Sequence, residues 1–254
     1  MSDKKGSLEK ALQIMRLLHH EDEFMGVSEI SRKLGISKGS IHRLLTSLES
    51  QGFVQQNNET KKYWLGIELY VMGAMVGNKM QLKDIVAPYA KELNEQFGEI
   101  VNVSVPEKSI GNCPRSLLIH KEVNKYQSLA AYPLVGASSE SYCSAVGKCL
   151  MAFNSEIDFS RFDDSTMKPY TEHTMTNWLD VEKECAQVRE KGYAIENEEN
   201  EYGLICIGVP IFNKARKLIA AISISGSVSR IKLDDIDDYV LALKQAAQKI
   251  SRLI

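Results

Sequence analysis

Apolar residues recur at helical spacing near the start of the chain, separated by polar positions. One face of a helix over 7–20 is predicted from five of them: Leu8, Ala11, Leu12, Met15 and Leu18. A shorter helix is predicted over 27–35, where Ser28 stands in the N-cap position and Gly35 in the C-cap position. Both helices have an apolar side that a third element can cover.

A third helix is predicted from Ser37, its N-cap, to about Gln51, where Gly52 stops it. Its apolar residues follow the i, i+3, i+4, i+7 pattern: Ile41, Leu44, Leu45 and Leu48. That stripe must be buried against the first two helices. Two short strands are predicted over 53–65, around a turn at 57–60. This order of elements is typical of a winged helix-turn-helix.

The segment 66–77 also has a helical pattern, but it is apolar on almost every side. We expect such a helix to link two halves of the protein and to pack against another surface, such as a second copy of the chain. Further elements are predicted at 82–98 (helix), 100–105, 117–123 and 128–132 (strands), 143–153 and 179–190 (helices), 193–196, 204–212 and 218–225 (strands) and 234–254 (helix). Short turns join the last strands, which favours an antiparallel sheet.

The predicted fold class is therefore α+β, in three parts. A winged helix-turn-helix domain occupies residues 1–66, a linker helix residues 67–80, and an α+β domain with a mostly antiparallel sheet residues 81–254. The chain of 254 residues has a net charge of −2, but residues 1–66 carry ten Lys and Arg against eight Asp and Glu. A basic front end on an acidic body is the sign expected of a nucleic-acid-binding first domain.

Composition narrows the class of protein further. The start of the chain has no apolar signal segment, and no apolar run is long enough to span a membrane, so we expect a cytoplasmic protein. Its five cysteines form no CxxC pair. This argues against a disulfide framework or a structural zinc site and favours small buried side chains in a reducing compartment.

The side of the third helix opposite its apolar stripe is small, polar and basic. Gly39, Arg43, Thr46 and Ser50 share it, and from Arg32 to Arg43 there is no acidic residue. A recognition helix enters the DNA major groove with small residues that allow close approach, and Arg, Thr and Ser there can contact base edges. Helix N-terminal amides bind phosphates.

The candidate DNA-binding residues lie in both helices and in the wing: Ser28, Arg32, Ser37, Lys38, Gly39, Ser40, His42, Arg43, Thr46, Lys61 and Lys62, with Tyr63 beside them. An exposed polar stripe is by itself most often a solvated helix face. The alternative function is a sensor or protein-interaction module that keeps a degenerate helix-turn-helix. The order of helix, turn, basic helix and basic wing favours double-stranded operator DNA as the partner.

Several motifs resemble one protein family. Residues 7–75, with SLEKALQIMRLL, SKGSIHRLLTSLESQGFV and YWLG, resemble the DNA-binding domain of the IclR family of bacterial transcription regulators. SYCSAVGKCLMA over 141–152 and the run over 188–231 resemble motifs of the family's second domain. The resemblance implies a sheet of PAS/GAF type that binds a small-molecule effector. A single winged helix reads only a few base pairs, so we expect a homodimer or a dimer of dimers.

The candidate effector-binding residues are Gly136, Ala137, Tyr142, Glu196, Cys206, Ser223 and Ser225. The last four resemble the family's effector-lining positions, and the two serines share one face of a strand. Amides near Gly136 precede a helix start and are expected to hold an acid group. Tyr142 stands in a segment, Glu140-Ser141-Tyr142, that departs from the family's usual Pro-Leu-His, which favours a larger aromatic or sugar-derived acid. The alternative is that the serines bond to nearby backbone and Cys206 is core.

Enzymatic interpretations find little support. The AVGK segment lacks the glycine and hydroxyl residue of a phosphate-binding loop, and no local pattern supports a Cys/His nucleophile. The acidic run 196–201 lacks the ligand order of a calcium loop, and we expect a solvated loop with Glu196 alone turned inward. A metal site from Cys113, His120 and His173 is a weak alternative. We expect no cofactor, no metal and no catalytic residue.

Overall fold

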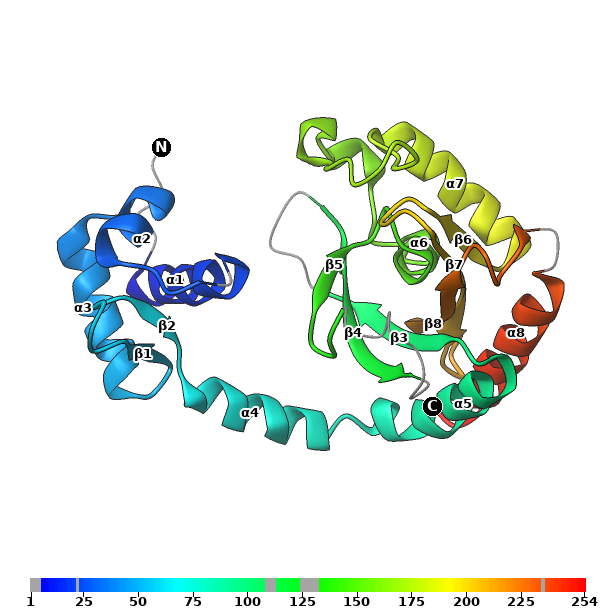
Figure 1. Ribbon diagram of the computed structural model, residues 1–254, viewed down its shortest axis with the longest axis horizontal. Coiled ribbons are helices and arrows are strands. Elements are labelled where there is room, and N and C mark those ends of the chain that lie inside the picture. Colours follow the sequence, from blue (N-terminus) through cyan, green and yellow to red (C-terminus); the bar gives the residue numbers. More distant parts are fainter. Residues whose placement is uncertain (1–5, 22, 108–112, 124–132, 234–235) are drawn as a thin grey trace. The chain divides into compact units, whose positions relative to one another are not determined.

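The computed structural model describes residues 6–21, 23–107, 113–123, 133–233 and 236–254. The chain forms two compact units, residues 1–80 and residues 81–254 (Figure 1). The strand predicted over 128–132 lies outside the described residues.

The first unit contains three helices, a hairpin and a fourth helix: α1 (Ser7–Glu21), α2 (Val27–Leu34), α3 (Lys38–Ser50), β1 (Val54–Gln56), β2 (Tyr63–Leu65) and α4 (Ile67–Asn78). The buried side chains of its core come from the first five elements and the loop before α2: Ile14, Leu18, Met25, Ile30, Ile41, Leu45, Val54 and Tyr63. The predicted winged helix-turn-helix is confirmed. In the apolar stripe of α3, Ile41 and Leu45 are buried, and Leu44 and Leu48 are half-buried against the same core.

The buried face of α1 differs from the predicted one. Ile14 and Leu18 are fully buried, whereas Leu8 is 75% and Leu12 41% exposed. Residues four apart lie above one another on a helix, so Ile14 and Leu18 form the stripe that meets the core. The prediction was wrong about the first turns of α1. The packing of the neighbouring helices determines which side of α1 is buried, and the number of apolar residues on a side does not.

The start of α2 and the wing also depart from the predictions. The N-cap of α2 is Gly26 rather than Ser28, and the Gly26 N–H donates to Glu29 Oε2 at 2.6 Å. Tyr63 is buried because Met25 pairs with it as a third, single-residue strand, through backbone bonds of 2.9 and 2.8 Å. Its side chain therefore belongs to the core and is not a DNA contact, and Ser28 lies exposed in the first helical turn.

The second unit is an α+β domain built on one six-stranded sheet. Its elements are α5 (Gln81–Phe97), β3 (Ile100–Pro106), β4 (Arg115–Glu122), β5 (Ser138–Glu140), α6 (Ala145–Ala152), the short helices η1 (Phe159–Arg161) and η2 (Asp164–Thr166), α7 (Trp178–Lys191), β6 (Ala194–Asn197), β7 (Leu204–Phe212), β8 (Leu218–Ser227) and α8 (Asp237–Ser251). The strand order is β5-β4-β3-β8-β7-β6, and every pairing is antiparallel. The sheet curls around α6, and α5 and α8 cover its other face (Figure 1).

The two faces of the sheet differ in chemistry because side chains alternate along each strand. Ile207 lies opposite Ile224, so both point away from α6. Cys206 lies opposite Ser225, on the face that α6 covers. The α6 side of the sheet is therefore partly polar, and the side under α5 and α8 is apolar.

Helix α6 approaches its surroundings so closely that two glycines are required. A Cβ atom at Gly208 of β7 would lie 2.9 Å from the backbone of Ala145, and one at Gly147 would overlap the backbone of Ser141. The start of the helix is fixed by Ser144, whose Oγ accepts the Gly147 N–H at 3.1 Å.

We predict that Gly147→Ala lowers the free energy of unfolding of the second unit by about 1–3 kcal/mol, because the methyl group forces backbone atoms apart. Chemical unfolding followed by circular dichroism measures this loss. Gly39→Ala is the matched control, since Gly39 also lies in the first turn of a helix but has no atom within 4 Å of its Cβ position. Equal stability of the two variants would show that α6 can move away from Ser141.

Candidate functional site

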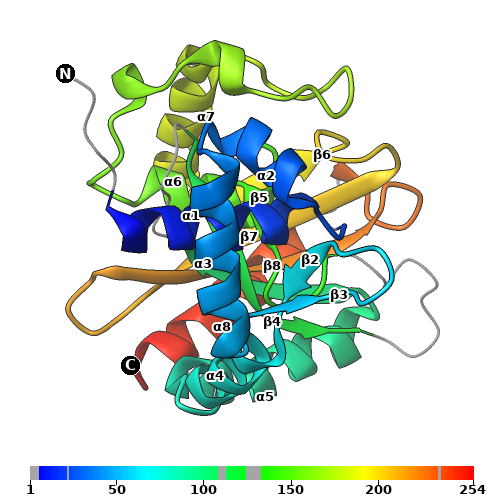
Figure 2. The ribbon, with the colours of Figure 1, turned by 90° about the vertical axis from the view of Figure 1, so that its left-hand side faces the viewer.

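Helix α3 presents one uncovered face. Ile41 and Leu45 are buried, and Gly39, His42, Arg43 and Thr46 on other sides of the helix are exposed. In Figure 2, α3 lies in the foreground with α1 crossing behind it. The exposed hydroxyl of Thr46 donates to the His42 carbonyl at 3.0 Å, which is a local bond that leaves its oxygen open as an acceptor.

The six basic residues of α2, α3 and the wing divide into two groups. Lys33 pairs with Glu21 at 2.7 Å, and Lys62 approaches Glu29 at 3.5 Å. The others have no carboxylate partner among the residues that the structure describes: Arg32, Lys38, Arg43 and Lys61. These four cations keep an unneutralised positive field around α3 and the wing.

Gly39 and Ser37 at the start of α3 are not explained by the fold of the chain. Gly39 is helical, costs about 1 kcal/mol relative to alanine, and has open space around its Cβ position. Ser37 stands in the N-cap position, but its side chain makes no capping bond. Ser40 is half-buried at the edge of the face. Nothing inside the molecule demands a small residue at position 39.

In the second unit, a group of polar side chains lies on the sheet face toward α6; we call Asn102, Glu196, Cys206, Ser223 and Ser225 the polar sheet face. Glu196 of β6 lies opposite Cys206 of β7, which lies opposite Ser225 of β8. Ser223 and Asn102 form the next row, on β8 and β3. The strand order therefore brings Glu196, Cys206, Ser223 and Ser225 together on one face, as predicted.

Two oxygen atoms of the polar sheet face are buried without a hydrogen-bond partner among the described residues: Asn102 Oδ1 and Glu196 Oε2. The other ends of these side chains are used. Asn102 Nδ2 donates to Ser225 Oγ at 3.2 Å, and Glu196 Oε1 accepts the N–H groups of Glu199 and Asn200 at 2.8 and 3.1 Å. An unpaired buried acceptor costs roughly 1–3 kcal/mol, so both atoms mark a functional candidate.

Burial dominates the electrostatics of this face. It raises the pKa of the Glu196 carboxyl, against the opposing effect of Cys206 and of the N–H groups of Asn200 and Glu199. Burial also raises the pKa of the Cys206 thiol well above its ordinary value, with the Glu196 charge adding to the effect. A thiol held in its protonated form is a poor nucleophile, so we interpret Cys206 as a small polar side chain that lines this face.

Glu199 is a second acidic residue turned inward, and the expectation that Glu196 is alone in this was wrong. Lys148 of α6 is 1% exposed, and its Nζ donates to Glu199 Oε1 at 2.5 Å and to the Ile195 carbonyl at 2.9 Å. In the run after β6, the Glu199 carboxylate is therefore the partner of a buried lysine.

Tyr142 is fully buried in the core of the second unit, in the same cluster of side chains as Cys206. Its ring packs edge-on against Trp178 in the core, and its hydroxyl both donates to the Lys168 carbonyl and accepts the Lys168 N–H, at 2.9 and 2.8 Å. Burial raises its pKa to about 12. The expectation that Tyr142 stacks on a ligand is not supported, because the ring and the hydroxyl are already used.

The amides of Gly136 and Ala137 are also used within the protein. The Gly136 N–H donates to the Leu118 carbonyl at 2.8 Å, and the Ala137 N–H to the Leu134 carbonyl at 2.9 Å. They lie directly before β5, a strand that the sequence analysis did not predict. Two paired N–H groups at a sheet edge differ from the open anion site that the sequence predicted.

Glu140, the acid of the segment that departs from the family pattern, has its own partners. Its carboxylate accepts from Arg115 Nη1 at 2.7 Å and from the Tyr170 hydroxyl at 2.8 Å. Despite burial, the Tyr170 and Arg115 contacts lower the pKa of Glu140 overall. This cluster fixes β5 to β4 and to the segment before α7.

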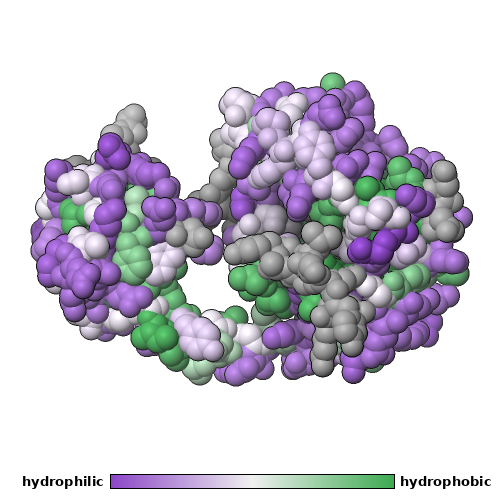
Figure 3. All heavy atoms as spheres, in the orientation of Figure 1, coloured by the Kyte–Doolittle hydropathy of each residue, from purple (hydrophilic) through white to green (hydrophobic). Residues whose placement is uncertain are grey.

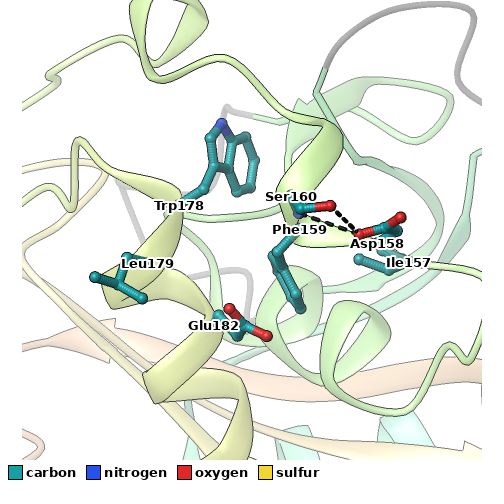
Figure 4. A pocket seen from close by; sticks show the side chains of 7 residues that line it. All are labelled: Ile157, Asp158, Phe159, Ser160, Trp178, Leu179 and Glu182. Carbon is teal, nitrogen blue, oxygen red and sulfur yellow. Dashed lines mark hydrogen bonds between the residues drawn. The ribbon is translucent and has the colours of Figure 1, made fainter.

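A pocket of about 400 Å³ lies elsewhere in the unit, between η1 and the start of α7 (Figure 4). It is lined by Ile157, Asp158, Phe159, Ser160, Trp178, Leu179 and Glu182. Asp158 is occupied in capping η1, since its Oδ1 accepts from Ser160 N at 3.2 Å and from Ser160 Oγ at 2.6 Å. None of the predicted effector residues lines this pocket, so it is a separate feature of the surface.

The described part of the chain contains no cluster of side chains that could form the alternative metal site of Cys113, His120 and His173. His120 Nε2 lies 3.0 Å from Glu122, and His173 packs near Tyr202, without three suitable ligands in one place. Within the same residues, no helix has the length and apolar character needed to cross a membrane.

Sequence reasoning missed Asn102. In the stretch Ile100-Val-Asn-Val-Ser-Val105, polar Asn102 and Ser104 alternate with valines. This period of two indicates one polar face and was the available signal. Its partners on β8 could not be known, because they are more than a hundred residues away.

Comparison with known proteins agrees with this architecture. The chain matches the description "Bacterial transcriptional regulator IclR C-terminal" over residues 74–252 and "IclR helix-turn-helix domain" over residues 7–58. The HTH-type transcriptional regulator KdgR of Escherichia coli (strain K12) is 32% identical over 251 residues, which cover 98% of this chain and 92% of that protein.

Two solved structures are similar in fold. An IclR transcriptional regulator from Alicyclobacillus acidocaldarius is 25% identical, with a TM-score of 0.79 over 98% of both chains. An IclR homologue from Microbacterium hydrocarbonoxydans, complexed with 4-hydroxybenzoate, has a TM-score of 0.74 at 18% identity, over 97% of this chain and 98% of that one. The chain therefore belongs to the IclR family of bacterial transcriptional regulators, with a DNA-binding helix-turn-helix domain and no enzymatic assignment.

Proposed function

We propose that this regulator binds operator DNA through α3 and the wing, and that a small organic acid bound at the polar sheet face changes its affinity for DNA. The observation that carries the DNA part is the exposed face of α3, where Arg43 and Lys38 have no carboxylate partner among the described residues. As a regulator of bacterial DNA, the protein would act in the cytoplasm.

The individual contacts follow from the chemistry of the groove. Gly39 leaves room for the helix to approach base edges, and Arg43, His42 and Thr46 supply donors and acceptors. Contacts to phosphate come from the first turns of α2 and α3, from Arg32 in the last turn of α2 and from the wing; they involve Ser28, Arg32, Ser37, Lys38, Ser40, Lys61 and Lys62. Phosphate contacts fix the orientation of the helix, and base contacts give sequence specificity.

The effector part rests on the unpaired acceptors of the polar sheet face. Asn102 Oδ1 and Glu196 Oε2 lower the stability of the empty protein, and a ligand with matching donors offsets that cost. A raised pKa of Glu196 reduces the repulsion between its carboxyl and the carboxylate of a bound acid. A ligand so bound stabilises the conformation that holds it, which is the thermodynamic requirement for an effect on DNA affinity.

We further propose that α4 joins two copies of the chain. None of its residues is buried, and Ile67, Tyr70, Met75 and Val76 are each at least 60% exposed. Figure 3 shows apolar side chains gathered along this segment. A contiguous apolar surface of this kind is typical of a protein–protein contact, and a dimer supplies the two recognition helices that a specific operator needs.

Arg43→Ala is predicted to weaken binding to the DNA upstream of the protein's own gene by about 1–3 kcal/mol, through loss of a base contact. Lys38→Ala is predicted to weaken binding to all DNA sequences and to reduce the dependence of affinity on salt. Fluorescence anisotropy at several salt concentrations measures both effects.

Arg252→Ala is the matched control for these variants, since it removes one exposed positive charge from the second unit. We expect it to bind DNA like the wild type. Unchanged affinity of both Arg43→Ala and Lys38→Ala at moderate salt would contradict the proposed DNA-binding face and favour a non-DNA interaction module.

The double variant Met72→Glu, Val76→Glu is predicted to be a folded monomer with poor operator binding, because two carboxylates would be buried in the contact between α4 helices. Sedimentation velocity and circular dichroism provide the two measurements. Leu253→Glu, at an apolar position that is 55% exposed in the second unit, is the control. A variant that sediments like the wild type would exclude α4 as the dimer contact.

Glu196→Gln tests the state of the Glu196 carboxyl. Because the pKa is raised above 4.5 in the folded protein, the stability from its protonated form is complete below about pH 4.5 and is lost as pH rises through the folded pKa. The amide does not titrate, so the free energy of unfolding of the variant relative to the wild type should increase from pH 4.5 to pH 7.

Urea unfolding across this pH range measures the difference, and Glu201→Gln, at an exposed position, controls for removal of a charge. A Glu196→Gln difference that stays constant with pH would mean that burial does not govern this carboxyl.

A further inference from the structure

The polar sheet face has an ordered arrangement of charge. One row runs from Lys121 on β4 through Asn102 on β3 to Ser223 on β8. The adjacent row runs from Ser225 through Cys206 to Glu196. Residues directly opposite each other in antiparallel strands point to the same side, with Cβ atoms about 5 Å apart. A cation therefore stands at one end of the face and a carboxyl at the other, with hydroxyls and an amide between them.

Asn102 is the residue whose chemistry the fold leaves incomplete. Its amide nitrogen donates to Ser225 Oγ, which holds the side chain in place, while Oδ1 is buried and unpaired among the described residues. A carboxamide oxygen can only accept hydrogen bonds. A ligand group that meets it must be a donor.

Glu196 supplies the second open position. Glu196 is 1% exposed; its Oε1 accepts two backbone N–H groups, and its Oε2 is buried without a hydrogen-bond partner among the described residues. Oε2 accepts a hydrogen bond when the group is ionised and can donate one when it is protonated. A hydroxyl group satisfies either state, whereas a keto oxygen or a methylene group leaves Asn102 Oδ1 unpaired.

We propose that Asn102 is a specificity-determining residue of the effector site and that, with Glu196, it selects a carboxylic acid carrying at least two hydroxyl groups. This inference rests on the proposed binding of an acid at the polar sheet face. Lys121, whose Nζ donates to the Pro133 carbonyl at 3.1 Å, puts positive charge at the β4 end, and this charge favours the acid group there and the hydroxyl groups toward Asn102, Ser223 and Glu196.

The test compares acids of equal length and charge that differ in their hydroxyl groups. Glycerate is paired with propionate and gluconate with hexanoate, and binding to the full-length protein is measured by isothermal titration calorimetry. Glycerol and glucitol are the neutral counterparts. We expect the hydroxylated acid of at least one pair to bind about tenfold or more tighter than its partner, the difference that one buried hydrogen bond supplies.

Two variants of nearly equal volume assign this preference to Asn102. Asn102→Leu removes the acceptor, and the ratio of affinities for the hydroxylated and plain acids should fall about tenfold. Asn102→Asp keeps an acceptor at the same place, so the ratio should be retained while every acid binds more weakly beside the added charge. Thermal unfolding and ligand-free DNA affinity establish that each variant is folded.

The outcomes separate this inference from the function on which it rests. Equal affinities within both pairs, or an unchanged ratio in Asn102→Leu, would overturn the role of Asn102 while leaving an acid effector in place. Loss of the ratio in Asn102→Asp would also overturn it, because the contact would then be to the amide nitrogen. If no acid binds, or if the polyols bind as tightly as the acids, both the inference and the proposed acid effector fail.

Discussion

The close approach of α6 to the sheet is the constraint on which the second unit depends. Gly208 and Gly147 allow backbone to meet backbone, and a methyl group at either position would collide with it. Lys148, on the same helix, carries a charge into this contact and pairs with Glu199. Removing one partner of such a pair would leave a buried charge, with a cost of roughly 3–5 kcal/mol, so the helix and the run after β6 are fixed together.

This geometry explains why the curled sheet has a polar patch beside an apolar core. Small residues lie where α6 presses on β7, and the neighbouring rows carry Asn102, Cys206 and Ser225. Glu196 connects the patch to the helix, since one carboxyl oxygen holds the backbone of Glu199, whose own carboxylate pairs with Lys148. Two hydrogen bonds therefore connect Glu196 to α6 by way of Glu199.

The first unit differs from the second, because its polar and basic residues lie on the surface around an apolar core. Ile41, Leu44, Leu45 and Leu48 pack α3 against the core, and the opposite face of that helix is exposed. Two residues at the start of α3 do not favour the stability of this unit. The Ser37 side chain makes no capping bond, and Gly39 is a glycine inside a helix with open space around its Cβ position. The proposed DNA partner, which has phosphates and a groove, accounts for residues of this kind on one basic face.

The sequence by itself determined the winged helix-turn-helix, the polar side of α3, the antiparallel sheet and the shared face of Ser223 and Ser225, because periods of 3.6 and 2 are local properties of the backbone. Tertiary structure alone decided which side of α1 is buried, that Tyr142 is core, and that the Gly136 and Ala137 amides are already paired. It also brought Asn102 beside Ser223, across 121 residues of chain. Such outcomes depend on strand order and on competing partners distant in sequence, which no local pattern contains.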